Sequence, residues 1–488
     1  MDGVNRDPVR NTPAAEGLAA QVSGPVLRPG DDGYDAERDG FQTARRHRPD
    51  LIVGATGPDD VRAAVAFAAD RGLPVAVQAT GHGLSIPADG GVLISTRRMT
   101  GVRIDAAART AWIEAGVRWN QVVEAAAPYG LAPLNGSAPH TGAVSYTLGG
   151  GLGLLARRHG YAVDQVRRLD VVTADARLRH VTPDGDPDLF WALRGGRDNF
   201  GVVTGMRIGL VPVTRLYGGG LFFSADVAAD VLNTFREWTR ALPDAMTASV
   251  GMIPYPDVPA IPEPMRGRHI VHVRIAHLGP ADDGERLVAP LRSAAPLLLD
   301  TLADLPYAES GSIYNDPATP HAYSGSNILL SGLDGAAVRT VVDLAGPDAP
   351  VPCVVDLRHL GGALARTPAV TSAVGHRDAA YLLRVLSPVD GADPATVRAA
   401  HLRVFEAMRP WSTGGRSLNF VYGDHATADQ VRDAYEPGDH RRLTELKAVH
   451  DPANMFRLNH NIPPASRPSA ARTSCRAGFS GGSGGTSQ

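Results

Sequence analysis

A run of glycines interrupts the first third of the chain, in the segment Leu148-Gly-Gly-Gly-Leu-Gly-Leu-Leu-Ala156. Glycine has no side chain, so this run lets the backbone approach a ligand or another segment closely. Within it, Gly151-x-Gly153-x-x-Ala156 matches the fingerprint of dinucleotide-binding proteins. In those proteins the motif directly follows an apolar strand and begins a long crossover helix. Here the preceding residues 144–147 are half polar, and a further glycine follows at 160. The pattern therefore favours a bare backbone wall over a nicotinamide site, with a tight turn in a packed sheet as the alternative.

A second loop of small residues, Ala79-Thr-Gly-His-Gly-Leu-Ser85, comes directly after the apolar stretch Val75–Gln78. Its amides and hydroxyls are suited to form an anion nest for a diphosphate. His82 stands between two glycines, which leaves its ring little cover from neighbouring side chains. This arrangement suits a histidine presented to a ligand, although a lone histidine is also a common surface residue.

Residues 46–212 mix helices with short strands. Pro58 opens a helix in which apolar residues recur at i, i+3, i+4 and i+7 from Val61, and Gly72 and Pro74 end it. Strands are predicted at 75–78, 92–95, 102–105, 110–115, 168–173 and 202–208, with a further short helix at 117–127. The pattern predicts an α+β fold.

Residues 213–416 differ, because proline-rich loops separate strands with a clear two-residue alternation. In one strand Cys353, Val355 and Leu357 oppose Val354, Asp356 and Arg358, which predicts an antiparallel sheet with one face covered. Helices are predicted to flank this sheet, one at 224–242 and one opened by Asp393 and Pro394. The chain is then predicted to close with a strand at 417–422 and a helix at 440–449.

These patterns divide the chain into five segments. They are an N-terminal extension (1–45), a first unit (46–212), an antiparallel-sheet domain (213–416), a closing part of the first unit (417–465) and a Ser/Gly-rich tail (466–488).

The charges and cysteines exclude several classes of function. With 48 basic and 51 acidic residues, the net charge of −3 provides no field that would attract nucleic acid or an anionic membrane. The chain has only 2 cysteines and none of the common zinc or serine-nucleophile motifs in its ordered part, so no metal site is predicted. We find no signal peptide and no apolar run long enough to span a bilayer, and we expect a cytoplasmic protein.

Taken in order, the motifs resemble one family, the FAD-linked oxidases of the berberine bridge enzyme type, in particular its bacterial members, within the vanillyl-alcohol oxidase (PCMH-type) superfamily. The resemblance covers roughly 46–210 and 417–464. It rests on Thr80-Gly-His-Gly83, Thr141-Gly142 followed by Leu148-Gly-Gly-Gly-Leu-Gly153, Val172-Thr-Ala-Asp175, Asp188-Leu-Phe-Trp-Ala-Leu-Arg-Gly-Gly196, Asn199-Phe-Gly-Val-Val-Thr204 and the C-terminal Asp451-Pro-Ala-Asn-Met-Phe-Arg-Leu-Asn-His-Asn-Ile462.

The resemblance implies a two-lobed FAD-binding domain built from both ends of the chain, with the middle segment as a substrate domain above the flavin. His82 occupies the family's position for a covalent bond to the flavin. A second, cysteinyl link is not expected, because His140 stands in its segment Ala138–Gly142. The residues expected at the cofactor are Thr80, Gly81, His82, Gly83, Leu84, Ser85, Ser137, Thr141, Gly142, Tyr146, Thr147, Gly149, Gly150, Gly153, Val203 and Asn459.

The proton acceptor expected in such an enzyme is less clear from the sequence. Bacterial relatives place a tyrosine in a Tyr-x-Asn-Tyr stretch, whereas the matching segment here is Ser417-Leu-Asn-Phe420. Asp356, on the polar face of its strand, and Tyr146 are the predicted catalytic residues. Alternatives are a surface ion pair between Asp356 and Arg358, and a packing role for Tyr146.

The leading hypothesis is an FAD-dependent oxidoreductase, with O2 as acceptor, that removes a hydride from a small organic substrate of specialised metabolism. A redox-neutral cyclase or a drug-binding resistance protein on the same fold is the second hypothesis. A nicotinamide dehydrogenase that uses the glycine run is the third.

Overall fold

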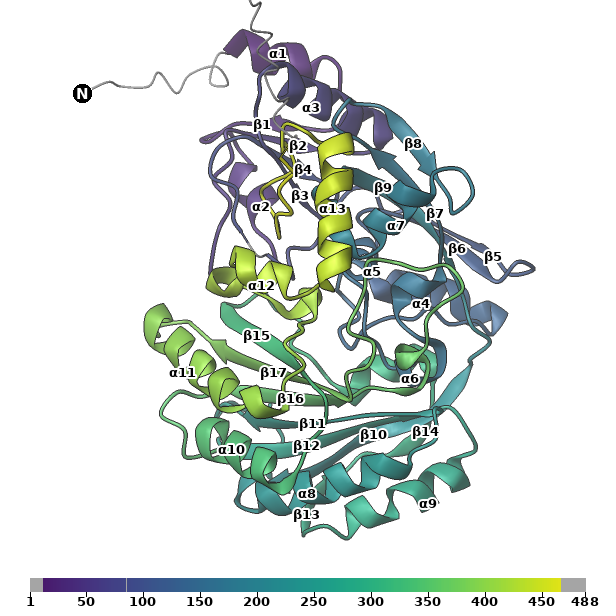
Figure 1. Ribbon diagram of the computed structural model, residues 1–488, viewed down its shortest axis with the longest axis vertical. Coiled ribbons are helices and arrows are strands. Elements are labelled where there is room, and N and C mark those ends of the chain that lie inside the picture. Colours follow the sequence, from purple (N-terminus) through teal and green to yellow (C-terminus); the bar gives the residue numbers. More distant parts are fainter. Residues whose placement is uncertain (1–11, 85, 467–488) are drawn as a thin grey trace, which may run out of the picture.

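The computed structural model describes residues 12–84 and 86–466, which form two lobes stacked along the long axis of the molecule (Figure 1). Both ends of the described chain lie in one lobe, and the middle of the chain forms the other. Three sheets organise the structure, two in the first lobe and one in the second. The α+β class predicted from the sequence is confirmed.

The smaller sheet of the first lobe has the order β1-β2-β4-β3, with β2, β4 and β3 parallel to one another. Its strands and nearby helices are β1 (Val26–Leu27), β2 (Leu51–Gly54), β3 (Val75–Gln78), β4 (Val92–Ser95), α1 (Thr12–Ala19), α2 (Tyr34–Arg38) and α3 (Pro58–Asp70). Helix α3 begins as predicted, with Pro58 in its first turn, and it buries Val61, Ala64, Val65 and Ala68 completely.

The second sheet of this lobe is antiparallel throughout, in the order β5-β6-β9-β7-β8. Its strands are β5 (Val102–Asp105), β6 (Thr110–Glu114), β7 (Val166–Val172), β8 (Leu178–Val181) and β9 (Val202–Gly209). The helices of this part are α4 (Trp119–Ala126), α5 (Ala143–Leu148), α6 (Ala156–His159) and α7 (Pro187–Gly196). Aliphatic and aromatic side chains of the sheet and the helices pack into one large apolar cluster.

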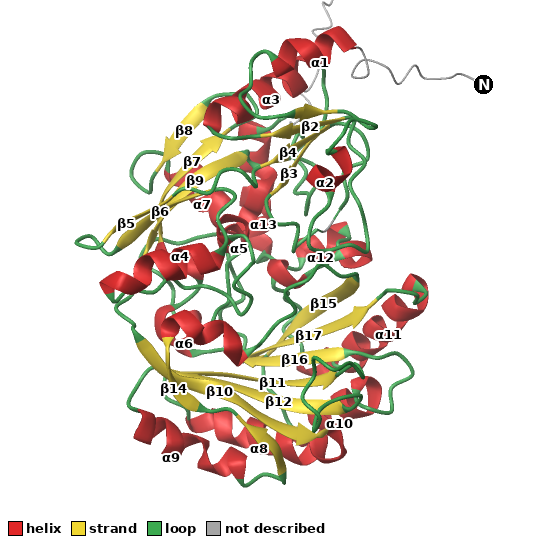
Figure 2. Ribbon diagram, turned by 180° about the vertical axis from the view of Figure 1, so that it is seen from behind, coloured by secondary structure: helices red, strands yellow, loops and turns green. Residues whose placement is uncertain are grey.

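The other lobe is built on an antiparallel sheet with the order β13-β10-β12-β11-β16-β17-β15, in which β14 also pairs with β10. Its strands are β10 (Arg215–Ser224), β11 (Met246–Pro254), β12 (His269–His277), β13 (Leu297–Asp300), β14 (Ala303–Pro306), β15 (Tyr323–Leu330), β16 (Val354–His359) and β17 (Tyr381–Pro388). Helices α8 (Ala228–Trp238), α9 (Ala281–Arg292), α10 (Gly335–Ala345) and α11 (Pro394–Ala407) cover the face that points away from the first lobe (Figure 2).

The two faces of this sheet differ in chemistry. Val355, Leu357 and their neighbours pack against the helices in an apolar core. On the opposite face Asp356 and Arg358 are also buried, at 2% and 7% exposure, beneath the first lobe. The alternation was therefore predicted correctly, but both faces are covered rather than one.

After β17 and α11 the chain returns to the first lobe through α12 (Ala428–Arg432) and α13 (Pro437–His450), where α13 lies beside α7 (Figure 1). Lys447, the one lysine of the sequence, is 0% exposed and donates to the carbonyls of Asn199 and Phe456 and to the Asp451 carboxylate at 2.6–2.9 Å. The segment that follows reaches β3, where the Val75 amide donates to the Met455 carbonyl. Contacts far apart in the sequence thus fix the C-terminal segment to the first lobe.

The strand predicted at 417–422 is wrong. A short 3-10 turn at Leu418–Phe420 stands there instead. The backbone of Ser417 is held by the side chain of Asn327, which accepts from the Ser417 amide at 2.7 Å and donates to its carbonyl at 2.9 Å. An amide side chain therefore takes the place that a neighbouring strand would occupy, and no periodicity in residues 417–422 could reveal it.

Candidate active site

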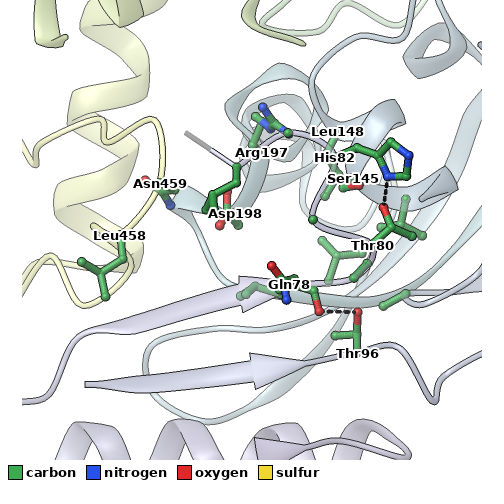
Figure 3. Close-up of a pocket in the computed structure, with 18 of the residues that line it drawn as sticks. Gln78, Thr80, His82, Thr96, Ser145, Leu148, Arg197, Asp198, Leu458 and Asn459 are labelled. Atoms are coloured by element: carbon green, nitrogen blue, oxygen red, sulfur yellow. Dashed lines mark hydrogen bonds between the residues drawn. The ribbon is translucent and has the colours of Figure 1, made fainter. Parts of the chain in front are cut away.

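A cavity of about 850 Å³ lies in the first lobe, between the end of β3, helix α5 and the C-terminal segment (Figure 3). The loop 79–84 forms one wall, and Leu458 and Asn459 of the C-terminal segment form another. The lining residues are His47, Val77, Gln78, Ala79, Thr80, Gly81, His82, Gly83, Leu84, Ile86, Thr96, Ala115, Val144, Ser145, Leu148, Arg197, Asp198, Val203, Leu458, Asn459 and His460.

The loop 79–84 owes its path to Gly40 and Gly81. Gly81 has a φ of +71°, and a Cβ added to it would come within 2.5 Å of the Gly40 Cα. The chain beside it pairs with the loop, since the amides of Phe41 and Gln42 donate to the carbonyls of Thr80 and Gly81 at 2.9 and 3.1 Å. Only glycine combines this conformation with this approach, so the motif fixes the loop.

His82 is held on three sides within this loop. Its Nδ1 lies 2.8 Å from the Thr80 hydroxyl, and its ring stacks on Phe41 with centroids 3.9 Å apart. The Tyr323 hydroxyl donates to its backbone carbonyl. Its Nε2 is buried and has no partner among the described residues. Burial, assisted by His140 and Arg118, lowers the pKa of His82 to about 3, so the ring is neutral at physiological pH.

A second cavity, of about 980 Å³, opens between the two lobes. It shares His82, Gly83, Ser145 and Arg197 with the first, so the two cavities meet at the histidine. The remaining lining residues are Phe41, Gly136, Ser137, Ala138, His140, Thr141, Tyr146, Leu152, Asp316, Pro317, His321, Tyr323, Arg358, Arg384, Leu386, Asn419, Phe420 and Tyr422.

The structure divides the predicted cofactor residues into three groups. Thr80, Gly81, His82, Gly83, Leu84, Val203 and Asn459 line the first cavity, and Ser137, Thr141 and Tyr146 line the second. Gly142, Thr147, Gly149, Gly150 and Gly153 line neither, and Ser85 lies outside the described residues.

The glycine run approaches protein rather than a cavity. A Cβ on Gly149 would lie 2.0 Å from Asn419 Oδ1, and one on Gly153 would lie 2.1 Å from the Asn135 carbonyl oxygen. A Cβ on Gly151 would meet the ring of Tyr146 at 2.6 Å. The prediction that the backbone of the run approaches something closely was correct, but the groups that it approaches are other residues of the chain. Helix α5 rather than a strand precedes the run, so the dinucleotide fingerprint does not stand in a βαβ unit. This excludes a nicotinamide dinucleotide site at the glycine run.

Asp356, one of the two predicted catalytic residues, lines neither cavity. It lies behind the wall of the second cavity, where it accepts from Arg274 at 3.1 Å and from Arg358 at 2.7 Å. Burial by itself raises the pKa of this carboxyl, but the guanidiniums of Arg358, Arg274 and Arg384 outweigh it and hold the pKa at about 2. A carboxylate with so low a pKa is a weak base. The alternative, an ion pair between Asp356 and Arg358 on the surface, is wrong, because the two side chains are only 3% and 9% exposed.

Tyr146, the other predicted catalytic residue, does line the second cavity. Its hydroxyl is buried and has no partner among the described residues, and burial raises its pKa above the ordinary value. The phenol therefore keeps its proton at neutral pH, which suits it to donate a hydrogen bond. Ser417, at the position of the family tyrosine, does not line the cavity, whereas Asn419, Phe420 and Tyr422 from the same segment do.

Several lining residues were missed from the sequence. Arg197, Ser145 and His460 border the cavities, and Arg197 Nη1 lies 3.2 Å from His460 Nδ1. Arg384 lies on β17, opposite Asp356 in register. The resemblance covered the segments of Arg197 and His460, so their neighbours could have pointed to them, but Arg384 carried no local signal.

Comparisons with known proteins agree with this geometry. A model of an FAD binding domain matches residues 49–182, and a model described as berberine and berberine like matches 418–463. The (R)-6-hydroxynicotine oxidase of Paenarthrobacter nicotinovorans is 31% identical over 464 residues, which is 91% of this chain and 97% of that protein. The chain belongs to the berberine bridge enzyme-like family of FAD-linked oxidases. An FAD-linked oxidoreductase of Bacillus subtilis, YgaK, is 25% identical over 92% of the chain and 98% of its own length.

Solved structures of other oxidases have the same fold. The crystal structure of 6-hydroxy-D-nicotine oxidase from Arthrobacter nicotinovorans matches with a TM-score of 0.76 at 25% identity, covering 91% of this chain and 98% of that one. A chitooligosaccharide oxidase matches with a TM-score of 0.80 at 20% identity, covering 93% and 100%. The protein is therefore an FAD-dependent oxidoreductase, as predicted.

The residues of the first cavity fit FAD. Buried polar atoms without partners, among them His82 Nε2 and Asn459 Oδ1, stand at its two ends, which is the pattern expected where a polar ligand completes the site. Gly81 and Gly83 contribute only backbone to the cavity wall on either side of His82. Among the described residues we find no helix able to cross a membrane and no group of three or more His, Cys, Asp or Glu arranged to hold a metal ion.

Proposed function

We propose that the protein is an FAD-dependent oxidase that takes a hydride from a small organic substrate, uses O2 as electron acceptor and holds its flavin covalently through His82. The observation that carries the proposal is the position of His82, where the cavity of the first lobe meets the cavity between the lobes. The names of its relatives, which include a nicotine oxidase and oligosaccharide oxidases, support the use of O2.

Support for a covalent bond comes from the chemistry of the His82 ring. The ring is neutral, so it has a free lone pair, and the Thr80 hydroxyl holds Nδ1. When Nδ1 carries the proton and donates it to Thr80, the lone pair is on the unpartnered Nε2. We therefore assign the bond to Nε2, with Phe41 stacked on the ring to fix its plane.

Bound FAD supplies the redox chemistry by accepting a hydride at its isoalloxazine ring. The residues of the second cavity hold the substrate and move its proton. Tyr146 donates a hydrogen bond from its hydroxyl. Two groups can accept a proton, the imidazole of His140, whose pKa is lowered by burial, and the carboxylate of Asp316, which accepts from the Ser137 hydroxyl at 2.6 Å. We place the proton acceptor at one of these groups instead of Asp356.

The test begins with the colour of the purified protein. We expect yellow protein that keeps its flavin after acid precipitation, while His82→Ala releases all of it. His140→Ala is the matched control, because its ring centroid lies 4.9 Å from that of His82 and its Nε2 is also buried without a partner. Colourless protein that binds no FAD contradicts the proposal, and flavin released from His140→Ala but retained by His82→Ala moves the bond to the neighbouring ring.

A redox-neutral reaction on the same scaffold is the second candidate. It is favoured by Ser417 and Phe420, which leave both tyrosine positions of the family motif without a phenol. Measured formation of one hydrogen peroxide per substrate turned over excludes it. Turnover without peroxide and without any added acceptor supports it.

A further inference from the structure

The wall that the middle lobe contributes to the second cavity carries more positive charge than the protein neutralises. Residues in register form rows that cross its sheet from strand to strand. One row contains Gly251 on β11, Asp356 on β16 and Arg384 on β17. The adjacent row contains Arg274 on β12, Ser249 on β11 and Arg358 on β16. Three guanidiniums, from Arg274, Arg358 and Arg384, therefore gather around the single carboxylate of Asp356, and all three lower its pKa.

Each oxygen of the Asp356 carboxylate accepts a hydrogen bond from a different arginine. One oxygen accepts from Arg274 and the other from Arg358 Nε. Gly251 allows this, since a Cβ there would lie 2.9 Å from Arg274 Nη1. Arg384 receives no acceptor from the described residues, and its Nε is buried without a partner. The terminal nitrogens of Arg358 likewise have no hydrogen bond to the described chain, although its side chain is only 9% exposed.

Both guanidiniums pack against one aromatic ring that also lines the cavity. Arg358 and Arg384 lie 5.0 and 5.3 Å from the centre of the Phe420 ring, and Tyr314 lies under Arg358 at 5.1 Å. Stacking on aromatic rings orients a guanidinium but supplies no acceptor for its N–H groups. The residues that line the cavity include three arginines, Arg197, Arg358 and Arg384, and one carboxylate, Asp316, which accepts from Ser137 and also attracts Arg358 electrostatically, so positive charge remains in excess.

Arg358 is buried and Arg384 is partly buried, so both guanidiniums lose part of their hydration and gain no acceptor for their remaining N–H groups, which costs free energy. A ligand that brings its own anion removes this cost, and a planar carboxylate matches the fork of an arginine with two parallel hydrogen bonds. Resting on the oxidase function proposed above, we propose that the substrate is a small organic molecule with a carboxylate, which binds between Arg358 and Arg384. The carboxylate then occupies the sheet end of the cavity, and the rest of the molecule extends toward the shared mouth at His82.

The test measures binding of carboxylates to the holoprotein by calorimetry and by the change in the flavin absorption spectrum. The probes are benzoate and phenylacetate, each compared with its neutral amide. We expect each carboxylate to bind at least about tenfold more tightly than its amide. Arg384→Met should remove this preference, and Arg384→Lys should keep part of it, because the charge remains while the fork is lost. Arg403→Met, an exposed arginine on α11 at the other face of the sheet, is the matched control and should bind as the wild type does.

Four results overturn the inference. The first is equal binding of carboxylates and amides to the wild type, and the second is an unchanged preference for carboxylates in Arg384→Met. The third is an Arg384 variant that loses bound flavin but keeps its carboxylate affinity, because Arg384 would then serve the cofactor. The fourth is tighter binding of sulfate than of benzoate, because the site would then accept any anion. Arg384→Lys serves if Arg384→Met does not fold. Calorimetry detects carboxylate binding by its heat and needs no flavin signal. Loss of the carboxylate preference is therefore distinguishable from failure of the oxidase proposal, which would appear as absence of bound FAD.

Discussion

The two walls of the cavity between the lobes are built in opposite ways. The wall around His82 comes from a loop of consecutive residues, held by close backbone contacts and carrying a neutral ring. The wall on the sheet presents Arg358 and Arg384 from two neighbouring strands, with the ion pair of Asp356 and Arg274 buried behind them. A loop of this kind depends on each glycine, whereas the sheet depends on a balance of charge among distant residues. The two walls therefore fail for different reasons.

The largest effect is expected from removal of the charge balance on the sheet. Asp356→Ala leaves Arg274 and Arg358 buried without their partner, and breaking a buried ion pair in this way costs about 3–5 kcal/mol. The free energy of unfolding, measured by denaturant titration, should fall by that amount. Asp343→Ala, an exposed residue on α10, is the control and should change it by less than about 0.5 kcal/mol. If both variants lose the same small amount, the charges of the sheet wall are not coupled.

The loop wall should respond instead to a single added methyl group. Gly81→Ala and Gly72→Ala impose the same left-handed strain, at φ of +71° and +63°, but only the first meets other atoms, with the Gly40 Cα at 2.5 Å. We expect Gly81→Ala to cost about 1–3 kcal/mol more than Gly72→Ala, because the clash adds to the shared strain. The measurement is the thermal or denaturant stability of both variants, with the fraction of bound flavin. Equal losses of stability in the two variants would show that the segments of Gly40 and Gly81 do not approach each other tightly.

The two walls also differ in their response to acid. Burial lowers the pKa of His47, beside the loop, to about 4, whereas an unfolded histidine titrates near ~6.5. As the pH falls through this window the unfolded chain binds a proton that the folded chain does not, so stability decreases, by up to about 1.4 kcal/mol per pH unit. The pKa of Asp356 is about 2, below an unfolded value of ~3.9, so its stabilisation is complete above that value and is lost only as the pH falls toward 2.

Denaturant titrations at pH 7, 6 and 5 measure this difference. His47→Gln should reduce the slope of stability against pH over this range, because one histidine no longer takes up a proton on unfolding. A slope identical to that of the wild type would mean that His47 is protonated in the folded protein.

The smallest effect concerns the hydrogen bond that orients His82. Thr80→Val removes the hydroxyl that lies 2.8 Å from Nδ1, while Thr80→Ser keeps it. A hydrogen bond of this kind contributes about 0.5–1.5 kcal/mol, so the rate of covalent flavin attachment to apoprotein should fall about 2- to 13-fold in Thr80→Val and little in Thr80→Ser. Acid-stable flavin absorbance against time measures the rate. An unchanged rate in Thr80→Val would leave the ring oriented by Phe41 alone.

The same contrast explains what could be predicted from the sequence. The position of His82 at a cavity followed from a short motif, because the glycines that shape the loop lie next to the residue they expose. Asp356 was correctly placed on a polar strand face, but its environment was not predicted, since its neighbours Arg274 and Arg384 come from other strands. Register between distant strands decides such contacts, and it leaves no trace near Asp356 in the sequence.

The glycine run shows an intermediate case. Its need for close approach was evident from composition alone, but the partner was not. Asn135 and Asn419 approach it from segments on either side in the sequence, the second of them 270 residues away from Gly149. Local sterics therefore predicted that something fits against the run, and only the tertiary structure says what.

The burial of Lys447 has a practical consequence. Because it is the one lysine in the sequence and its ammonium group is enclosed by Asp451 and two carbonyls, the folded protein presents no side-chain amine to reagents in solution. Amine-selective labels should reach this residue only when α13 separates from the first lobe. The molecule thus contains a built-in, single-residue chemical reporter of that opening, which mass spectrometry can follow without any substitution.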